Sequence, residues 1–412
     1  MATSTIADFY NYATLATASY VRMGNQPDGL RTDGAIFAQQ AAAQSGGRLP
    51  LPLGQRLLDP QFTVAGETQW AILNYYGGDV SGVSDNTGFA ATLFERDGEK
   101  VLALRGTEPG SDYGVDLFSA DLGAIGILGM ALPQVVSMVN LIPRLKGDAG
   151  TPVLQLSLQT SLTQPEGQYV RAEGAIPGTS VYMSFGLYTA TGLGLIGATE
   201  KVTVTGHSLG GHLAALAARL FPQIVNPDVY LYNAPGIDPT AVNLAGIIPG
   251  AGSLIATLLT TYLAATMGAA ATNLAFTANQ LTSQLINTIG SYLAQSPAPD
   301  WSSFTLHNLE SEDIAPGDDL SIVSSVLTGA QRFGPETFIS TEANSHLIEP
   351  FMDALALQAL LYQMRNNAFT SDDITRLLEV SSNQLVRSEE QLTKALFRLF
   401  LKDQKFIDAQ GV

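Results

Sequence analysis

The sequence contains no cysteine among its 412 residues. It therefore has no disulfides, no cysteine-ligated zinc and no thiol nucleophile. Charge is also scarce, at 14% of residues, and the 37 acidic residues outnumber the 20 basic ones, for a net charge of -17. This balance argues against nucleic acid as a partner. Hydrophobic residues make up 46% of the chain, which is typical of a globular protein with a sizeable core.

The start of the sequence lacks a basic stretch followed by a continuous apolar run. We therefore expect no cleaved signal peptide. The expected location is either outside the cell, by an export route without a cleaved N-terminal signal, or the cytoplasm. Glycine-aspartate nonapeptide repeats, which accompany one such route, are missing from the sequence.

Two long segments carry no charged residue, Leu122–Pro143 and Pro239–Pro299. The first is near the length of a membrane span, but glycines and Pro133 interrupt it, so we expect a buried or surface-apolar helical segment. In the second, leucine and isoleucine recur at helical spacing, which favours a lid or cap over a buried insertion or a pair of spanning helices. We expect no stable transmembrane span. The predicted caps cover approximately residues 122–175 and 239–300.

The pattern along the rest of the chain predicts a single domain over residues 1–412, with a C-terminal helical extension over 371–412. Asp97-Gly98 is a strong turn signal between two apolar runs and predicts a hairpin. Other expected elements are helices over 1–30, 61–76 and 180–196, and a polar loop over 157–174.

A β-branched run, Val202–Thr205, leads directly into Gly206-His207-Ser208-Leu209-Gly210 and then into an alanine- and leucine-rich helix. This order of strand, sharp turn and helix is the context of the G-x-S-x-G nucleophile elbow. The glycines leave room for neighbouring backbone, and the helix start directs N–H groups toward a developing oxyanion. Ser208 is therefore the candidate nucleophile.

The strand ending at Leu104 is followed by Arg105-Gly106-Thr107. A hydrolase needs its first oxyanion donor at this place, and Thr107 offers both its N–H and its hydroxyl. Leu209 N–H, directly after the nucleophile, is the second donor. The alternative for Thr107 is an ordinary turn at a strand end.

A further strand, Val229–Tyr232, follows the elbow helix. This alternation of strand, helix and strand predicts an α/β fold with a mostly parallel central sheet, flanked by helices and joined by right-handed crossovers. We expect the α/β-hydrolase version of it, with helical cap or lid insertions.

An activated serine needs a base and an acid that orients the base. In the elbow topology the chain order is serine, acid, histidine, and this order selects His346 among the four histidines. His207 is expected to point away from Ser208 and His212 to pack in the core, while His307 precedes the acidic candidates. An exposed histidine at a helix start is the alternative for His346. For the acid, Phe304–Leu306 predicts a strand and 307–317 a loop, in which Asp313 competes with Glu310, Glu312, Asp318 and Asp319.

Five segments, VLALRGT, VTVTGHSLGG, YLYNAPGID, LESEDIAP and NSHLIEPFMDAL, together resemble the class 3 lipase family of α/β-hydrolases, in its bacterial branch. In that family a strand-end R-G-T or R-G-S carries the oxyanion residue, G-H-S-L-G the nucleophile and D-x-V-P the acid, and a late histidine is the base. The resemblance covers roughly residues 88–361. It implies, position by position, Thr107, Ser208, Asp313 and His346, with Leu209 as second oxyanion donor.

Two features differ from the family pattern. The intervals from Thr107 to Ser208 and from Ser208 to Asp313 are longer than usual, and Ala315 stands in place of the expected valine. The long intervals contain the two uncharged segments, as insertions that build a cap would.

These observations predict a serine carboxylic-ester hydrolase, a lipase acting on triacylglycerol or other lipid esters at an oil-water or membrane interface. The alternatives are a phospholipase or an acyltransferase with the same triad, or a membrane-interacting protein with secondary esterase activity. No cofactor is expected. Asp318-Asp319 raises the option of a structural calcium ion, against the commoner solvated loop.

Overall fold

The computed structural model of the chain describes residues 5–21, 57–58, 69–77, 88–106, 132–161, 170–173, 180–222, 224–235, 304–311, 336–339, 348, 352, 354–356 and 358–359. Within these ranges the helices are α1 (Ile6–Ala18), α5 (Leu132–Lys146) and α6 (Leu209–Leu220). The strands are β1 (Ala71–Gly77), β2 (Ala90–Arg96), β3 (Glu99–Leu104), β4 (Pro152–Ser161), β5 (Val170–Glu173), β6 (Ser180–Thr191), β7 (Val202–His207), β8 (Val225–Tyr232), β9 (Thr305–Ser311) and β10 (Glu336–Ile339).

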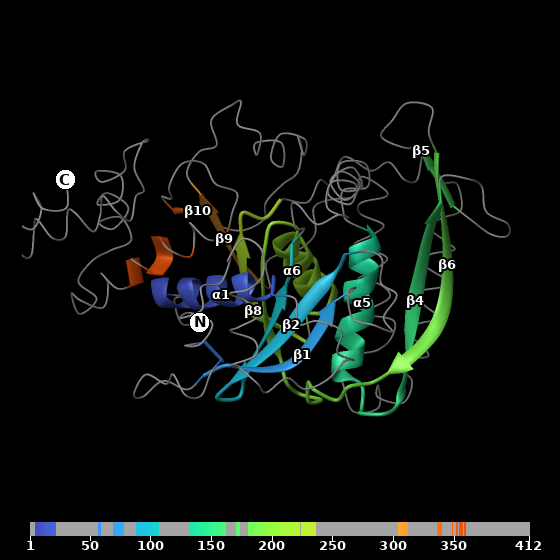
Figure 1. Cartoon of the computed structure of the whole chain (residues 1–412), viewed down its shortest axis with the longest axis horizontal. Helices are drawn as coiled ribbons and strands as arrows, with labels where there is room; N and C mark the ends of the chain where they lie inside the picture. Colours follow the sequence, from blue (N-terminus) through green and yellow to red (C-terminus); the bar gives the residue numbers. More distant parts are fainter. Residues whose placement is uncertain are drawn as a thin grey trace, which may run out of the picture.

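The central sheet has seven strands in the order β1-β2-β3-β7-β8-β9-β10. β1, β2 and β3 pair antiparallel, and every pairing from β3 to β10 is parallel. A second, antiparallel sheet has the order β4-β6-β5 and lies beyond α5 in Figure 1. The expected mostly parallel central sheet flanked by helices is confirmed.

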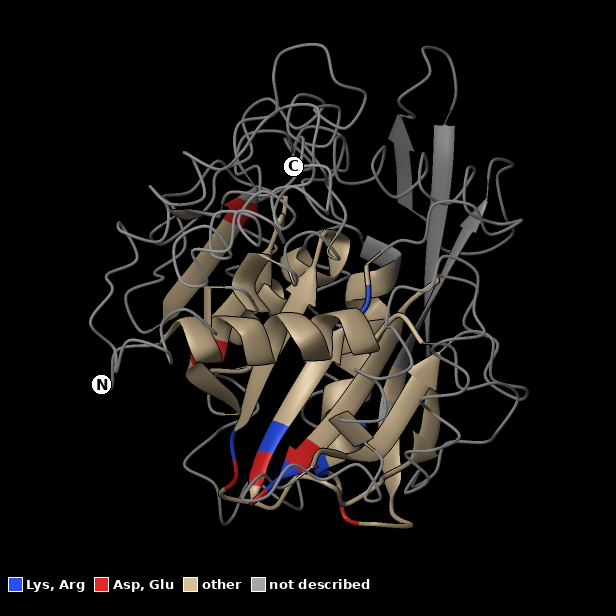
Figure 2. Cartoon of the chain, turned by 60° about the vertical axis from the view of Figure 1, so that its left-hand side comes forward, with Lys and Arg blue, Asp and Glu red and all other residues tan. Residues whose placement is uncertain are grey.

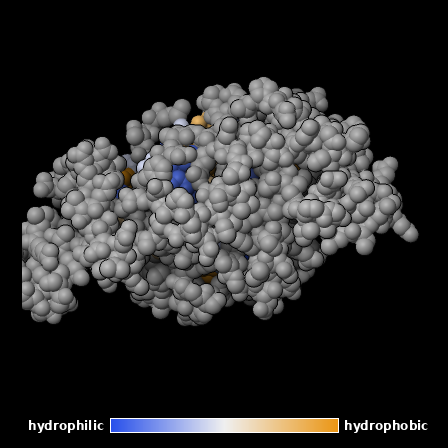
Figure 3. All heavy atoms as spheres, turned by 90° about the horizontal axis from the view of Figure 1, so that it is seen from above, coloured by the Kyte–Doolittle hydropathy of each residue, from blue (hydrophilic) through white to orange (hydrophobic). Residues whose placement is uncertain are grey.

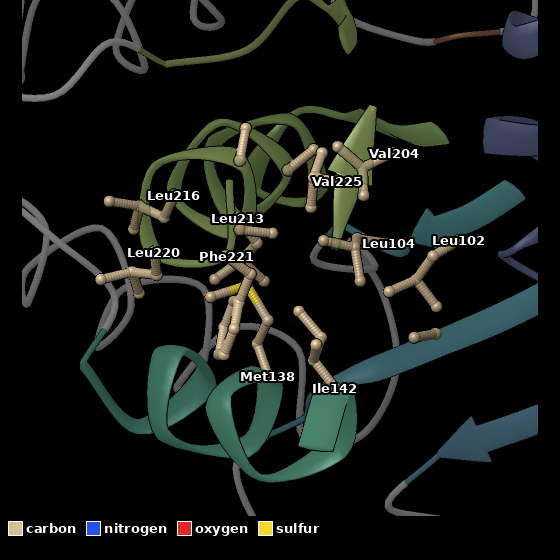
Figure 4. Packing of buried hydrophobic residues seen from close by; sticks show 14 of the residues in the cluster. Leu102, Leu104, Met138, Ile142, Val204, Leu213, Leu216, Leu220, Phe221 and Val225 are labelled. Atoms are coloured by element: carbon tan, nitrogen blue, oxygen red, sulfur yellow. The ribbon is translucent and has the colours of Figure 1, made fainter. Parts of the chain in front are cut away.

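Helices cover both faces of the central sheet (Figure 1). α5 and α6 pack on one face, where Met138, Ile142 and Leu213 join the core cluster that contains Leu102 and Leu104 of β3 (Figure 4). On the opposite face, α1 packs over the alternate positions of β3. A parallel strand buried on both faces is apolar at nearly every position, which explains the run Val101–Leu104.

The N-terminal helix is fixed at its start by its own sequence. Thr5 is the N-cap, and its side chain and that of Asp8 each accept from the other's backbone N–H, which forms a capping box. The apolar side of the helix then lies on the sheet, with Ala13, Leu15 and Ala16 at 0% exposure. The helix expected within residues 1–30 is confirmed over Ile6–Ala18.

Little of the described core reaches the surface. Tyr188 is the large hydrophobic residue that is exposed among those described, at 48%. Seen from above, the described residues form only small hydrophilic and hydrophobic spots, and no continuous apolar patch among them is in view (Figure 3).

The hairpin expected about Asp97-Gly98 is confirmed. β2 and β3 pair antiparallel from Ala91 and Leu104 to Arg96 and Glu99. Asp97 and Gly98 both have positive φ, 51° and 83°, as a two-residue hairpin turn requires.

Three expected elements are wrong in type. Residues 71–77, at the end of the helix expected over 61–76, form strand β1; the loop expected over 157–174 contains the end of β4 and all of β5; and the helix expected over 180–196 is strand β6 as far as Thr191. The loop expected from residue 307 is also wrong at its start, because β9 continues to Ser311. In each case the extended chain is held by pairing with a strand elsewhere in the sequence, which overrides local propensity.

The described part of Leu122–Pro143 belongs to α5, and it is buried in the core as expected for an apolar helical segment. The cap predicted for 122–175 stays a prediction for the other residues of that range. The cap predicted for 239–300 and the extension predicted for 371–412 lie outside the described residues.

Candidate active site

The carboxyl ends of four neighbouring strands meet at one edge of the central sheet. β3, β7, β8 and β9 run parallel in this order. Their register places Leu104 beside Gly206, and Tyr232 beside both His207 and Leu309. We call this edge the carboxyl edge. Open parallel sheets bind ligands outside the carboxyl ends of their strands, so this is the edge at which a site is expected.

Ser208 follows β7 directly and begins the turn into α6. Its backbone has φ 55° and ψ -131°, a conformation that residues other than glycine rarely adopt. Such strain costs about 1–3 kcal/mol and persists only where the surrounding structure enforces it. Here the Ser208 N–H donates to the Tyr232 carbonyl oxygen at 2.9 Å, and the Ser208 carbonyl accepts from Gly211 N–H at 2.9 Å. The expected order of strand, sharp turn and helix is confirmed.

Glycines around Ser208 let backbone segments approach closely. A Cβ on Gly206 would overlap the Gly210 carbonyl group, and a Cβ on Gly210 would overlap the Leu104 carbonyl oxygen at the end of β3. A Cβ on Gly211 would lie 2.6 Å from the Cβ of Ala234. The start of α6 therefore fits against β3, β7 and the end of β8 only because these three residues lack side chains.

Leu209, one of the two residues predicted to donate to an oxyanion, lies at the start of α6. Leu209 is the first residue of this helix and is 4% exposed. A first-turn N–H has no acceptor within its own helix, and the helix dipole places partial positive charge there. The Leu209 N–H therefore has the surroundings that an oxyanion donor needs, directly after Ser208.

The end of β3 approaches Ser208 from the other side. A Cβ on Gly106 would lie 3.2 Å from the Cβ of Ser208. Thr107, the other expected oxyanion residue, lies outside the described residues, which stop at Gly106 in this segment. The chain therefore runs into Thr107 from a point in contact with Ser208.

Among the candidate acids, only Glu310 lies within the described residues. It is 6% exposed in β9, next to Leu309, whose carbonyl accepts from Asn233 N–H at 2.9 Å. Glu310 is therefore a buried carboxyl group at the carboxyl edge, two strands from β7. Asp313 and its other rivals, Glu312, Asp318 and Asp319, lie outside the described residues.

The expected base, His346, also lies outside the described residues. Two residues later, Ile348 is 0% exposed in the cluster that contains Tyr232 and Leu309. Tyr232 is the last residue of β8, and Leu309 pairs with it two residues before the end of β9. The chain therefore returns to the sheet close to the carboxyl edge shortly after His346.

The other three histidines have surroundings of their own. His207 is 4% exposed, and its Nδ1 shares a 2.8 Å hydrogen bond with the Tyr20 hydroxyl. His212 is fully buried in α6, as expected for a core residue. His307 pairs with Asp228 at 3.0 Å, below the carboxyl edge, and stacks on the Tyr230 ring.

Tyr20 is a residue of the site that the sequence did not reveal. It lies just after α1, is 3% exposed, and its hydroxyl occupies the space that a side chain on Gly106 would need. Nothing local to Tyr20 signals this, because its partner His207 is 187 residues away in the chain.

Arg105 adds positive charge under the same edge. Its side chain is 8% exposed, and Nη2 donates to the Gly88 carbonyl oxygen at 3.3 Å. Nε and Nη1 have no hydrogen-bond partner within the part of the chain that the structure describes. A buried cation favours negative charge that develops nearby.

No group of three or more histidine, aspartate or glutamate side chains that would hold a metal occurs in the described ranges. Among the described helices, none combines the length and apolarity that crossing a bilayer requires.

No protein-family model matches this sequence, and a search of curated proteins returns no match.

Proposed function

We propose that this chain is a serine carboxylic-ester hydrolase with the α/β-hydrolase fold, similar to class 3 lipases, and that its substrates are lipid esters. The observation that carries the proposal is the strained Ser208, φ 55° and ψ -131°, at the turn between a parallel strand and a helix start. Strain of this kind clusters at functional sites. It is accompanied by glycines whose missing side chains bring the end of β3 against the nucleophile.

In the proposed first step the Ser208 hydroxyl attacks the ester carbonyl carbon while His346 accepts its proton, with Asp313 orienting the imidazole. The carbonyl oxygen becomes an oxyanion, which accepts hydrogen bonds from the Leu209 N–H and from Thr107. Collapse of the tetrahedral intermediate breaks the bond to the alcohol oxygen. The imidazolium returns its proton to the departing alcohol, and the acyl group stays on Ser208.

In the second step water attacks the acyl-enzyme. His346 takes a proton from the water, the same two donors hold the second oxyanion, and the carboxylic acid leaves as Ser208 regains its proton. An alcohol in place of water gives acyl transfer, so the same groups serve an acyltransferase. Each oxyanion donor contributes about 10²–10³-fold to the rate in such sites.

The lipid part of the proposal is supported by the two uncharged segments, Leu122–Pro143 and Pro239–Pro299. They fall in the two long intervals between the proposed site residues. Long uncharged insertions near a hydrolytic site suit substrates with long apolar chains, because burial of apolar surface stabilises binding by about 25 cal/mol per Å².

The nucleophile is tested with a fluorophosphonate probe followed by peptide mapping. We expect the label on Ser208 and no label in the Ser208→Ala variant, whose ester hydrolysis should fall by about 10⁴-fold or more. Ser137→Ala, at a buried serine of α5, is the matched control and should keep full activity. Full hydrolysis by folded Ser208→Ala would refute the proposal.

The base and acid are tested by matched pairs of variants. His346→Ala should abolish turnover, whereas His307→Ala should retain it, because His307 pairs with Asp228 below the carboxyl edge. Asp313→Asn and Glu310→Gln separate the two carboxyl candidates. A larger loss of kcat in Glu310→Gln would move the acid assignment to β9.

The substrate class is tested with esters of increasing acyl length, dissolved and emulsified. A lipase should prefer emulsified long-chain esters. A preference for phospholipids, or product esters formed from added alcohols, would select a phospholipase or an acyltransferase. Equal turnover of short dissolved esters would restrict the proposal to an esterase.

A further inference from the structure

We propose that Tyr20 is a positioning residue of this site: its hydroxyl, bonded to His207, sets the distance between the end of β3 and Ser208. This inference rests on the proposed function, since it concerns the oxyanion donor that follows Gly106. It assigns the segment after α1 a role in turnover, in addition to its place in the core.

The contacts of the Tyr20 hydroxyl carry the argument. It lies 2.8 Å from His207 Nδ1. Both residues are buried, Tyr20 at 3% exposure and His207 at 4%. The same oxygen occupies the position where a Cβ on Gly106 would point, and that Cβ would also lie 2.6 Å from the His207 carbonyl oxygen and 3.2 Å from the Ser208 Cβ. One hydroxyl therefore binds His207 at the end of β7 and fills the space beside Gly106, just after the end of β3.

The helix that precedes Tyr20, α1, is itself fixed to β7 and β8. The Thr205 hydroxyl of β7 donates to the Tyr12 carbonyl oxygen at 3.3 Å, and the Tyr232 hydroxyl of β8 donates to the Phe9 carbonyl oxygen at 2.6 Å. After the helix, the Tyr20 N–H donates to the Thr17 carbonyl oxygen at 3.1 Å. The tyrosine ring thus approaches Gly106 and His207 from a firmly held backbone.

The physical consequence concerns geometry rather than proton transfer. His207 is joined to Ser208 by one peptide bond, so a hydrogen bond that fixes its imidazole also limits rotation of the strained turn. Gly106 is joined in the same way to Thr107. Because a misplacement of about 1 Å at a catalytic group can cost about 10²-fold in rate, loss of this hydroxyl should reduce kcat while substrate binding stays the same.

The test compares two tyrosine-to-phenylalanine variants, one in α1 and one just after it. Tyr20→Phe should lower kcat by about 10- to 100-fold, slow fluorophosphonate labelling of Ser208 by a similar factor, and leave KM within about twofold. Tyr12→Phe is the matched control. Its hydroxyl donates to Glu99 at 2.6 Å, at the opposite end of β3, so kcat should be unchanged.

A second pair of variants changes the other partner. The side-chain amide of His207→Asn occupies the position of Nδ1 and keeps a group that pairs with the Tyr20 hydroxyl, whereas His207→Leu has none. We expect His207→Asn to retain several-fold more kcat than His207→Leu. This pair decides the question even if Tyr20→Phe fails to fold.

The outcomes separate this inference from the proposed function. Ser208 labelled at the same rate in the wild type and in Tyr20→Phe, with equal kcat, would overturn the inference and leave the hydrolase standing. Equal losses in Tyr20→Phe and Tyr12→Phe, or in the two His207 variants, would also overturn it. A wild-type protein without labelling at Ser208 would overturn both.

Discussion

The two ends of the parallel strands in the central sheet are stabilised by different interactions. Where the parallel strands begin, polar side chains pair: Lys100 lies 2.6 Å from Glu200, and His307 lies 3.0 Å from Asp228. Most of the charged residues coloured in Figure 2 lie toward this lower end of the strands. Where the strands end, three glycines pack against backbone, and Ser208 has positive φ.

The difference predicts which end of the strands tolerates amino-acid replacement and which end does not. Surface ion pairs contribute little each and tolerate replacement. Close backbone packing tolerates almost none, because a single added methyl group must displace main chain. Strain at Ser208 is therefore sustained by packing at the carboxyl edge, while the side-chain pairs where the parallel strands begin add only small increments of stability.

The largest effect is expected from alanine at Gly210. Alanine in a helix is normally favoured over glycine by about 1 kcal/mol. Here its Cβ would overlap the Leu104 carbonyl oxygen and lie 2.8 Å from the Arg105 carbonyl carbon. We expect Gly210→Ala to lower the free energy of unfolding by about 3 kcal/mol or more, measured by urea denaturation. A neutral result would show that the carboxyl edge is loosely packed.

Alkaline pH should lower the free energy of unfolding through Tyr12, which lies in α1. Burial, reinforced by the Glu99 carboxylate, raises the pKa of Tyr12 above its ordinary value of 10.0. The protonated phenol is favoured in the folded state, so its contribution is complete below pH 10 and falls as the pH rises toward the folded pKa. The expected slope is about 1.4 kcal/mol per pH unit. Tyr12→Phe should reduce this slope in unfolding experiments above pH 10, and an unchanged slope would assign it to other groups.

Gly98, in the hairpin turn that leads into β3, is the comparison site for Gly210. Its φ is +83°, but a Cβ there meets nothing within 4 Å. Gly98→Ala should therefore cost only the backbone strain, about 1 kcal/mol. Thermal denaturation of the two alanine variants side by side measures the difference between strain alone and a lack of space. A larger loss at Gly98 would reverse the comparison.

The smallest effect is expected at the Lys100 and Glu200 pair. A hydrogen bond from Lys100, followed by one from the Gly197 N–H, lowers the pKa of Glu200 below its ordinary value of 4.5. The stabilisation is present above pH 4.5 and is lost as the pH falls through the folded pKa. Because the Glu200 side chain is 41% exposed, Glu200→Gln should cost less than about 1 kcal/mol at pH 7. The variant and the wild type should converge in stability as the pH falls through the folded pKa of Glu200.

The sequence predicts those parts of the fold that local signals specify. The hairpin follows from Asp97-Gly98, whose residues both adopt positive φ. The turn at Ser208 follows from the glycines on either side and the apolar strand before it. In these places the residues that determine the structure lie within a few positions of one another, so a short stretch of sequence is enough to predict it.

The misassigned elements depend on distant partners. β1 was expected to be helical because Gly77-Gly78 resembles a helix end, yet the strand pairs with β2, and a register shift between Ile72 and Asn74 breaks the regular alternation. β4 has leucine at every second position, Leu154, Leu156 and Leu158, within a polar sequence, and pairs with β6 over its whole length. The alternating leucines of β4 are a local strand signal that the prediction of a loop from Ser157 did not use, whereas the identity of its partner β6 leaves no signal in the segment itself.

The candidate site divides in the same way. Ser208 and Leu209 are recognisable from their neighbours, and Glu310 was recognised as a possible acid although its burial in β9 was not. Tyr20 was missed because a tyrosine after an amphipathic helix is usually a core residue. Its importance comes from the meeting of α1, β3 and β7, which no short pattern contains.

The hydrogen bond between Tyr20 and His207 also has a consequence for the order of folding. Its partners are separated by 187 positions, so the chain closes a very long loop before the turn at Ser208 is complete. Contacts of this separation slow folding. The hairpin of β2 and β3 can form early, whereas the site is assembled only after α1 has docked on β7. During refolding, recovery of Ser208 labelling should therefore lag behind recovery of secondary structure.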